Sequence, residues 1–174
     1  MDILFTTERL AVRKFNPADY NDLADIIADP DVTYFEPYPT FTREACIQEA
    51  INYSESDEFF AVVLGNKVIG KIYFSRKGAG TYEIGYTFAA AYQGKGYASE
   101  SIKGFMNYAF SELQVRRIIA EIDTRNVKSV NLAERVGMRR EALHRELIPR
   151  KDDKTVFSDF YIYALLKSEF EDKE

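Results

Sequence analysis

Cysteine and histidine are almost absent from this chain, which contains one of each, Cys46 and His144. A single cysteine excludes an internal disulfide bond, and one cysteine with one histidine leaves too few ligands for a zinc site. Cys46 lies in a helical pattern, which favours a small buried thiol over a nucleophile. His144 stands beside charged residues in a strand-like run, which is typical of a surface position. We therefore expect no metal site.

An excess of basic residues is also missing, since 23 lysines and arginines face 28 aspartates and glutamates, a formal charge of −5. A general nucleic-acid-binding protein needs a basic face, so we expect no nucleic-acid partner. An acidic surface can instead accommodate a cationic amine. No apolar run reaches membrane-spanning length, and Met1-Asp2 opens no signal peptide. We expect no membrane partner and a cytoplasmic location.

The 174 residues have the composition of one globular domain spanning 1–174, with 46% hydrophobic and 29% charged residues. Hydrophobic periodicity and turn signals predict the order β-α-α-β-β-β-α-β-α-β-β. Strands are predicted at residues 9–15, 59–64, 68–75, 81–88, 117–123, 139–147 and 156–165. Helices are predicted at 17–28, at 42–53, at 97–113 and over a segment that Asn126 or Thr124 caps and Gly137 ends. This order predicts an α/β (α+β) fold, with a mixed, mainly antiparallel central sheet and helices on both faces.

A glycine-containing loop, Gln93-Gly94-Lys95-Gly96-Tyr97-Ala98-Ser99, connects a predicted strand to the predicted helix 97–113. Glycine lacks a Cβ, so the backbone can turn tightly there and come close to a ligand. The first N–H groups of a helix have no internal partner, and the helix dipole adds positive charge at the same end. Together these features predict a site for the phosphate oxygens of a cofactor.

Two common phosphate motifs do not fit this loop. The P-loop needs a glycine five positions before Gly94-Lys95, where the chain has Ala89. The dinucleotide fingerprint Gly-x-Gly-x-x-Gly fails at its last position, Ser99, and the hairpins predicted before the loop do not belong to a doubly wound parallel sheet. A glycine turn without any ligand is the plainer alternative.

The loop does resemble the pyrophosphate motif of the GNAT superfamily, the acetyl-CoA-dependent N-acetyltransferases. That motif is Gln/Arg-x-x-Gly-x-Gly/Ala, and the stretch from Gln93 to Ala98 fits every fixed position. Further similarities follow along nearly the whole chain: Thr7-Glu8-Arg9-Leu10, Glu83-Ile84-Gly85-Tyr86, Tyr108-Ala109-Phe110, Asn126-x-x-Ser129, Glu134-Arg135-x-Gly137-Met138 and Asp159-x-x-x-Tyr163-Ala164-Leu165. The set is similar to the RimJ/RimL-type branch, which contains the ribosomal-protein N-terminal acetyltransferases. The resemblance implies the GNAT-like acyl-CoA N-acyltransferase fold.

The resemblance also implies where acetyl-CoA would bind. Backbone groups of Tyr86, Thr87 and Phe88 would pair with the pantetheine arm like an added strand. N–H groups of the loop would hold the pyrophosphate, with the cofactor-binding set Gln93, Gly94, Lys95, Gly96, Tyr97, Ala98 and Ser99. The strands 82–88 and 117–123 would splay apart to admit the arm. Asn126 would reach the arm from its second side, or serve as a plain helix N-cap; both roles can hold together.

Acetyl transfer to an amine requires a deprotonated amine, a polarised thioester carbonyl and a proton or hydrogen bond for the departing thiolate. Many family members supply that proton from a tyrosine, but its position here is Ala133. Ser129 then becomes the best nearby hydroxyl, with a purely structural role as the alternative. The carboxylates to test as general base are Glu83 and Glu146, and water-mediated deprotonation would make either contribution small.

The acceptor is predicted to meet the loop between the first two helices, through Tyr34, Phe35, Glu36 and Tyr38. Aromatic faces and a carboxylate suit an ammonium group, although the same aromatics could simply close the core. The loop from Arg150 to Lys154 is a candidate opposite wall. We predict transfer of acetyl to a primary amine, either a protein N-terminal α-amine, toward which the branch resemblance points, or a small-molecule amine. A non-catalytic acyl-CoA-binding sensor is the alternative. Family analogy favours a homodimer.

Overall fold

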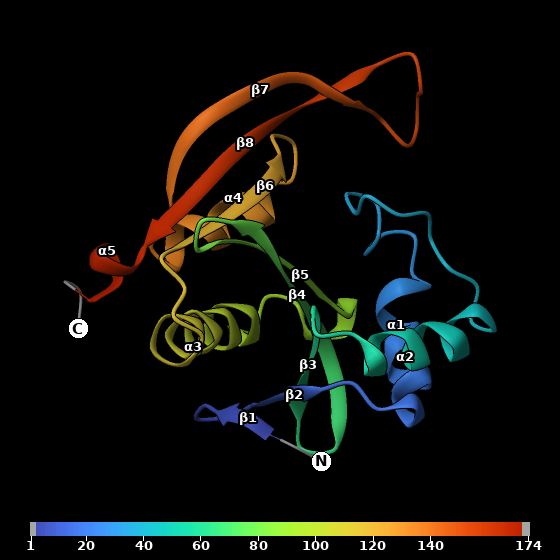
Figure 1. The fold of residues 1–174 in the computed structure, drawn as a ribbon. Helices are drawn as coiled ribbons and strands as arrows, with labels where there is room; N and C mark the ends of the chain where they lie inside the picture. Colours follow the sequence, from blue (N-terminus) through green and yellow to red (C-terminus); the bar gives the residue numbers. More distant parts are fainter. Residues whose placement is uncertain (1–2, 172–174) are drawn as a thin grey trace. The chain divides into compact units, whose positions relative to one another are not determined.

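The computed structural model describes residues 3–171, which form two compact units. The first unit runs up to Phe74 and resumes over Gly85–Tyr108; the second contains Ser75–Ile84 and continues from Ala109. The described residues include eight strands in the hydrogen-bonded order β1-β2-β3-β4-β5-β6-β8-β7 (Figure 1). The mixed, mainly antiparallel sheet is confirmed, because β5 and β6 pair in parallel whereas the pairs β1-β2, β2-β3, β3-β4, β6-β8 and β7-β8 are antiparallel. A single domain spanning 1–174 stays a prediction.

The strands of the first unit agree with the sequence prediction at some boundaries and differ from it at others. They are β1 (Ile3–Thr6), β2 (Ala11–Lys14), β3 (Phe59–Leu64) and most of β4 (Lys67–Gly78), while β5 (Thr81–Phe88) belongs to both units. The predictions of β3 and β5 hold to the residue. The prediction of a strand at 9–15 is wrong at its start, because Thr7 to Leu10 form a turn in which the Thr7 N–H donates to the Leu10 carbonyl (2.8 Å). Strand β1 was not predicted.

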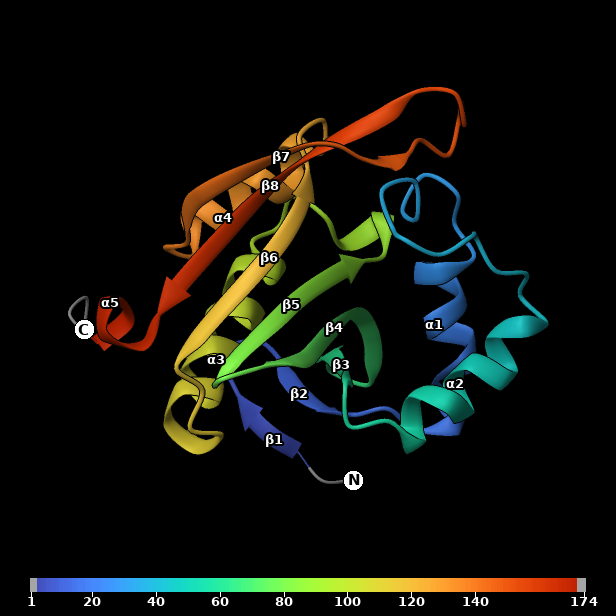
Figure 2. The same cartoon turned by 45° about the horizontal axis from the view of Figure 1, so that its top comes forward.

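The predicted helix at 17–28 begins with a capping box. Asn16 accepts from the Ala18 N–H, Asp19 accepts from the Asn16 N–H, and Pro17 occupies the first turn. A 3₁₀ turn η1 (Pro17–Asp19) therefore precedes α1 (Tyr20–Ile27). Helix α2 (Ala45–Glu55) begins three residues later than predicted, and α1 and α2 lie side by side (Figure 2). Their buried residues share one core cluster with Ala61 and Val63 of β3.

The opposite face of the first unit's strands packs on the part of α3 (Tyr97–Glu112) that belongs to this unit, up to Tyr108. The Phe105 ring of α3 lies 5.1 Å from the Phe60 ring and 5.0 Å from the Phe74 ring, centroid to centroid. Phe60 and Phe74 alternate along their strands with Ala61 and Tyr73, so they project to the other side. Helices on both faces of the sheet are confirmed in this unit.

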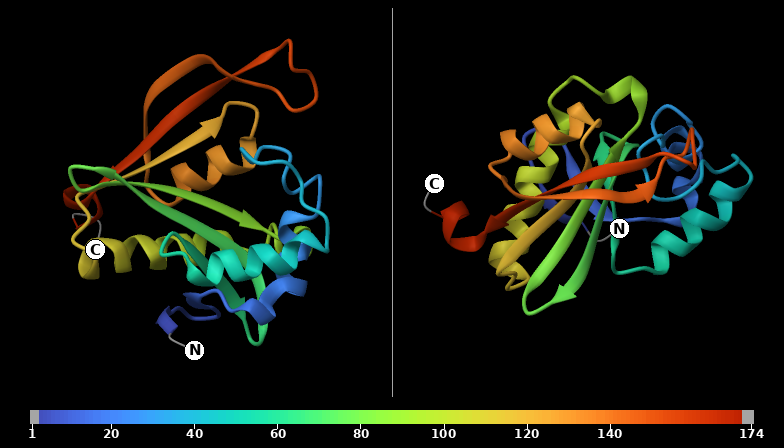
Figure 3. Two further views of the ribbon diagram at one scale, coloured as in Figure 1. Left: turned by 45° about the vertical axis from the view of Figure 1, so that its right-hand side comes forward. Right: turned by 90° about the horizontal axis from the view of Figure 1, so that it is seen from above.

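The second unit contains β6 (Arg117–Asp123), α4 (Val127–Arg135), β7 (Arg139–Pro149), β8 (Phe157–Leu166) and a short α5 (Lys167–Glu171) that was not predicted. Strand β6 pairs with β5 over Thr81–Glu83 and with β8 along its whole length. Strands β7 and β8 form a long hairpin, shown in two views in Figure 3. Its register shifts between His144 and Ile148, so β7 is bulged there. Cys46 is buried and His144 is exposed, as predicted.

Candidate active site

The glycine loop between β5 and α3 adopts backbone angles that glycine permits. Gly94 and Gly96 have φ values of +73° and +82°, in the left-handed region. A Cβ at Gly94 would meet no heavy atom within 4 Å, so conformation, not crowding, calls for glycine there. Gly94, Lys95 and Gly96 are all exposed. The Gln93 side chain donates to the Phe88 carbonyl (2.9 Å) and ties the start of the loop to the end of β5.

Helix α3 begins directly after this loop. Its first intrahelical bond runs from the Glu100 N–H to the Gly96 carbonyl (3.0 Å). The N–H groups of Gly96, Tyr97 and Ala98 precede that bond and lie at the positive end of the helix dipole. The loop therefore has the backbone geometry and the polarity that an anionic group requires, in a part of the chain open to solvent.

The end of β5 presents Thr87 toward the loop between α1 and α2. Thr87 is buried, and its hydroxyl donates to Glu36 Oε1 (2.8 Å). Gly85 shares this face, since a Cβ there would lie 3.5 Å from the Tyr73 Cβ. Gly85 and Thr87 thus lie on one side of β5, as the alternation of side chains along a strand requires.

Glu36 has a second partner that the sequence did not reveal, Lys71 of β4. The Lys71 ammonium lies 3.6 Å from Glu36 Oε2, with side-chain exposures of 3% and 21%. It also lies 4.7 Å from the centroid of the Tyr38 ring and 5.7 Å from that of Phe59. Burial lowers the pKa of Lys71, against the opposing effect of Glu36. The carboxylate that was predicted to attract the acceptor's ammonium group is therefore already paired with a positive charge.

The aromatic residues of this loop divide between two roles. Tyr38 packs against the core cluster, and its ring lies 5.6 Å from Phe41, so it closes the core, as the plainer interpretation predicted. Burial, together with Glu36, raises the pKa of the Tyr38 hydroxyl above its ordinary value. Tyr34 and Phe35 are partly exposed and pack edge to face, with centroids 4.7 Å apart. They remain the aromatic surface that an acceptor could contact.

In the second unit, Asn126 is the N-cap of α4. The sequence had allowed either Asn126 or Thr124 as this cap. The Asn126 side chain accepts from the Ser129 N–H (3.3 Å). The turn before it is fixed by Asp123, whose carboxylate accepts from the Arg125 backbone and guanidinium groups. Despite the opposing effect of burial, these hydrogen bonds hold the pKa of Asp123 below its ordinary value. Ala133 is fully buried, so the position of the family tyrosine offers no group to solvent.

The two carboxylates predicted as general base differ in their surroundings. Glu83 forms an ion pair with Lys77 across the hairpin of β4 and β5 (2.6 Å). Glu146 is exposed in the bulge of β7, with φ of +50°, and its backbone N–H donates to Asp159 (2.8 Å). In the loop that follows, Arg150 pairs with Asp152 (2.7 Å). The structure thus gives Glu83 a cationic neighbour and leaves the Glu146 carboxylate near solvent.

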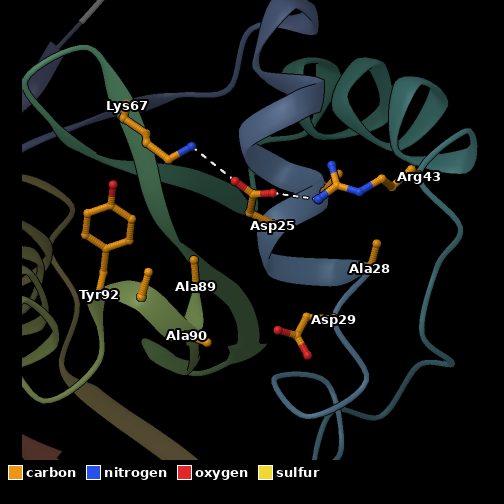
Figure 4. A pocket seen from close by; sticks show the side chains of 10 residues that line it. Asp25, Ala28, Asp29, Arg43, Lys67, Ala89, Ala90 and Tyr92 are labelled. Atoms are coloured by element: carbon orange, nitrogen blue, oxygen red, sulfur yellow. Dashed lines mark hydrogen bonds and ion pairs between the residues drawn. The ribbon is translucent and has the colours of Figure 1, made fainter.

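A pocket in the first unit lies beside the residues that lead into the glycine loop (Figure 4). No sequence pattern indicated this pocket. It is lined by alanines at the end of α1 and around the 3₁₀ turn η2 (Ala90–Tyr92), by Tyr92, and by the charged side chains of Asp25, Asp29, Arg43 and Lys67. Asp25 bridges Arg43 (2.8 Å) and Lys67 (3.1 Å), which hold its pKa below the ordinary value even though burial acts in the opposite direction. Asp25, Arg43 and Lys67 are therefore already paired with one another, whereas the Asp29 carboxylate accepts from the Asp31 N–H (2.9 Å). Among residues 3–171, no group of three or more histidine, cysteine, aspartate or glutamate side chains could hold a metal ion.

Comparison with known proteins identifies the family. The Acetyltransferase (GNAT) domain matches residues 9–139. The chain belongs to the GNAT family. The "Uncharacterized N-acetyltransferase YnaD" of Bacillus subtilis (strain 168) is 35% identical over 170 residues, covering 95% of this chain and 98% of that protein. A GNAT-family acetyltransferase from Bacillus anthracis, known from its crystal structure, is 34% identical with a TM-score of 0.87, covering 97% of this chain and 99% of that one.

A more distant structure shares the GNAT fold. It is "RimL- Ribosomal L7/L12 alpha-N-protein acetyltransferase", in complex with coenzyme A, with a TM-score of 0.82 at 17% identity, covering 95% of this chain and 98% of that one. The predicted family and fold are confirmed, and the chain is an acetyl-CoA-dependent N-acetyltransferase. The alternative of a non-catalytic acyl-CoA sensor is not favoured. No helix among residues 3–171 is both long and apolar enough to cross a membrane.

Proposed function

We propose that this GNAT enzyme transfers acetyl from acetyl-CoA to a protein N-terminal α-amine, with small-molecule amines as the second class of acceptor. The binding of acetyl-CoA is supported by the glycine loop, in which two glycines with left-handed backbone angles expose the start of α3 to solvent. In the reaction, the lone pair of the neutral amine attacks the thioester carbonyl. A C–N bond forms, the C–S bond breaks, and the sulfur leaves as a thiolate that takes up a proton.

The cofactor would be held mainly by backbone groups. N–H groups from Gln93 to Ser99 bind the pyrophosphate, and those of Tyr86, Thr87 and Phe88 pair with the pantetheine arm. Asn126, an N-cap in the structure, adds a contact to the arm through its side-chain nitrogen while its oxygen stays on the Ser129 N–H. The fit of loop conformation and helix polarity to a diphosphate supports this assignment.

Proton transfers would involve few side chains. Ser129 donates a hydrogen bond to the departing thiolate, because the buried Ala133 cannot replace the family tyrosine. Glu146 and Glu83 remain the carboxylates proposed as base, and the solvent-exposed Glu146 is the one from which a proton can leave directly to water. Partial exposure of Tyr34 and Phe35 supports their contact with the acceptor. A protein acceptor is supported by the fold shared with a ribosomal-protein α-N-acetyltransferase. Homodimer formation stays a prediction from family analogy, and the cytoplasmic location stays a prediction from the sequence.

The test is release of free thiol from acetyl-CoA with matched acceptors. A short peptide with a free N-terminus is compared with its Nα-blocked form, and spermidine and free lysine represent small amines. We expect turnover with the free peptide and none with the blocked one. Turnover with spermidine alone would move the proposal to polyamines, and no thiol release with any amine would refute it.

A further inference from the structure

One segment singled out by the sequence has no role in the chemistry above: the turn Thr7-Glu8-Arg9-Leu10. In the structure this turn lies against the first turn of α3, about 90 positions later in the chain, and both belong to the first unit. The Thr7 hydroxyl donates to Glu100 Oε1 (2.6 Å), and the Arg9 N–H donates to the same oxygen (2.8 Å). Arg9 Nε donates to Glu100 Oε2 (2.7 Å). One carboxylate therefore collects three donors from the turn.

Glu100 is well placed to act as an anchor. Its side chain is 17% exposed and stands in the first turn of α3, where the helix dipole favours a negative charge. Burial alone would raise the pKa of Glu100, but the hydrogen bonds from Thr7 and Arg9 lower it. Glu100 is thus a carboxylate at neutral pH, and it fixes the position of the Arg9 guanidinium.

The other edge of that guanidinium reaches the glycine loop. Arg9 Nη1 donates to the Lys95 carbonyl (3.2 Å), and the guanidinium carbon lies 4.5 Å from the centroid of the Tyr97 ring. A second guanidinium nitrogen lies 3.3 Å from the point that a Cβ on Gly96 would occupy. Arg9 therefore contacts Lys95 and Tyr97 and lies beside the Gly96 between them.

The contact with the Lys95 carbonyl sets the direction of an amide that the cofactor needs. The Lys95 carbonyl and the Gly96 N–H belong to one planar trans peptide, so they point in opposite directions. Holding the carbonyl on the Arg9 side turns the Gly96 N–H to the other side of the loop. Two glycines give this exposed loop unusual freedom, which a ligand would otherwise have to remove on binding.

We infer that Arg9 is a positioning residue for the cofactor's diphosphate, holding the loop 94–97 in its binding conformation through the Lys95 carbonyl and the Tyr97 ring. The inference rests on the proposed function, because it assumes that the loop receives the pyrophosphate. Arg9 acts through the backbone of the loop, and its contacts with Glu100 keep it in place.

The test compares a cofactor that uses the loop with one that cannot. Arg9→Gln should weaken coenzyme A binding by about tenfold in calorimetry, the size expected for loss of one charge-assisted hydrogen bond. Turnover of acetyl-pantetheine, which lacks the pyrophosphate, should stay at the parent level. The matched control is Arg43→Gln, which removes a 64% exposed arginine from the ion pair with Asp25 and should change neither quantity. Equal loss with both cofactors would show a general structural defect and overturn the inference.

The conservative variant separates geometry from charge. Lysine has a single ammonium and cannot reproduce the planar guanidinium that joins Glu100 to the Lys95 carbonyl, so Arg9→Lys should bind coenzyme A as weakly as Arg9→Gln. Full recovery by lysine would show that positive charge alone matters and would overturn the positioning role. Should Arg9→Gln not fold, Glu100→Gln tests the same contact from the helix, with the same expected split between coenzyme A and acetyl-pantetheine.

The two proposals fail in different ways. If the parent protein does not bind coenzyme A at all, the proposed cofactor site is refuted, whatever the variants do. If the parent binds coenzyme A and Arg9→Gln binds it equally well, the cofactor assignment survives and the role of Arg9 is refuted.

Discussion

The ion pair between Lys71 and Glu36 allows a quantitative prediction, because one partner is enclosed and the other is partly open. Their charged atoms lie 3.6 Å apart, with side-chain exposures of 3% for Lys71 and 21% for Glu36. At an effective dielectric constant of about 20, two unit charges at this distance attract by about 5 kcal/mol. Removing one charge from a buried pair typically costs about 3–5 kcal/mol, since the other charge stays buried.

The two single substitutions should therefore differ. Glu36→Gln leaves the enclosed Lys71 ammonium without its carboxylate, and we expect a loss of about 2–4 kcal/mol in unfolding free energy at pH 7. Deprotonation of Lys71 limits the cost. Lys71→Met leaves a carboxylate that still accepts from Thr87 and reaches solvent, so the loss should be about 1 kcal/mol or less. The double variant should resemble Lys71→Met.

Raising the pH provides a second test of the same pair. Burial lowers the folded-state pKa of Lys71 below its ordinary value, and Glu36 opposes that shift. Without Glu36 the folded-state pKa falls further, so the unfolded chain binds more protons than the folded one over a wider range below the ordinary lysine pKa of 10.5. Stability rises with pH wherever the unfolded state binds more protons. The cost of Glu36→Gln should therefore shrink as the pH rises from neutrality toward that value.

Urea unfolding at constant ionic strength, at pH 7 and again near the alkaline end of this range, measures both effects. The matched control is Glu44→Gln, an exposed glutamate at the start of α2, for which a change within about 0.5 kcal/mol is expected. Equal losses for Glu36→Gln and Lys71→Met, independent of pH, would contradict an enclosed ammonium at position 71.

Three further predictions concern the proposed site. Gly96→Glu should abolish coenzyme A binding in calorimetry, because a carboxylate would oppose the diphosphate at a residue with φ of +82°; unchanged affinity would place the cofactor elsewhere. Ser129→Ala should lower kcat by about tenfold or more with little change in the KM for acetyl-CoA, as expected for a hydrogen bond made mainly to the thiolate; an unchanged kcat would return Ser129 to a structural role. Glu146→Gln should lower kcat/KM for the amine more than Glu83→Gln, whose carboxylate is paired with Lys77; the opposite order would make Glu83 the base.

Much of the fold could be predicted because residues typical of turns and helix caps stand at the ends of its helices and strands. Strand β5 lies between a turn of three residues with positive φ, Gly78 to Gly80, and the glycine loop, and its range was predicted to the residue. Asn16-Pro17 is a pair typical of a helix start, and in the structure a capping box forms there, just before α1. Strand β1 carries no such signal: it has four residues, and Ile3 at its start is 55% exposed.

The sequence could not predict which charged residues form ion pairs with one another. Side chains alternate between the two faces of a strand, so the face on which Lys71 lies could be assigned from the sequence. The sequence did not show whether other residues bury that face. The partner of Lys71 is 35 positions away in a loop without regular structure, and Glu100 is 91 positions from Arg9. Both contacts depend on how distant segments pack, which periodicity and spacing do not determine.

The pairing of Glu36 with Lys71 changes the effect that the loop 34–38 would have on the pKa of a nearby acceptor amine. An unpaired carboxylate would bind the ammonium form and raise the pKa of the acceptor, which would hinder the deprotonation that the reaction requires. A carboxylate already compensated by a buried ammonium exerts much less of this effect, and its two oxygens are engaged by Thr87 and Lys71. The aromatic surfaces of Tyr34 and Phe35 can still contact an uncharged amine. A surface on which the Glu36 carboxylate is paired with Lys71 thus suits the neutral nucleophile better than one with an unpaired carboxylate.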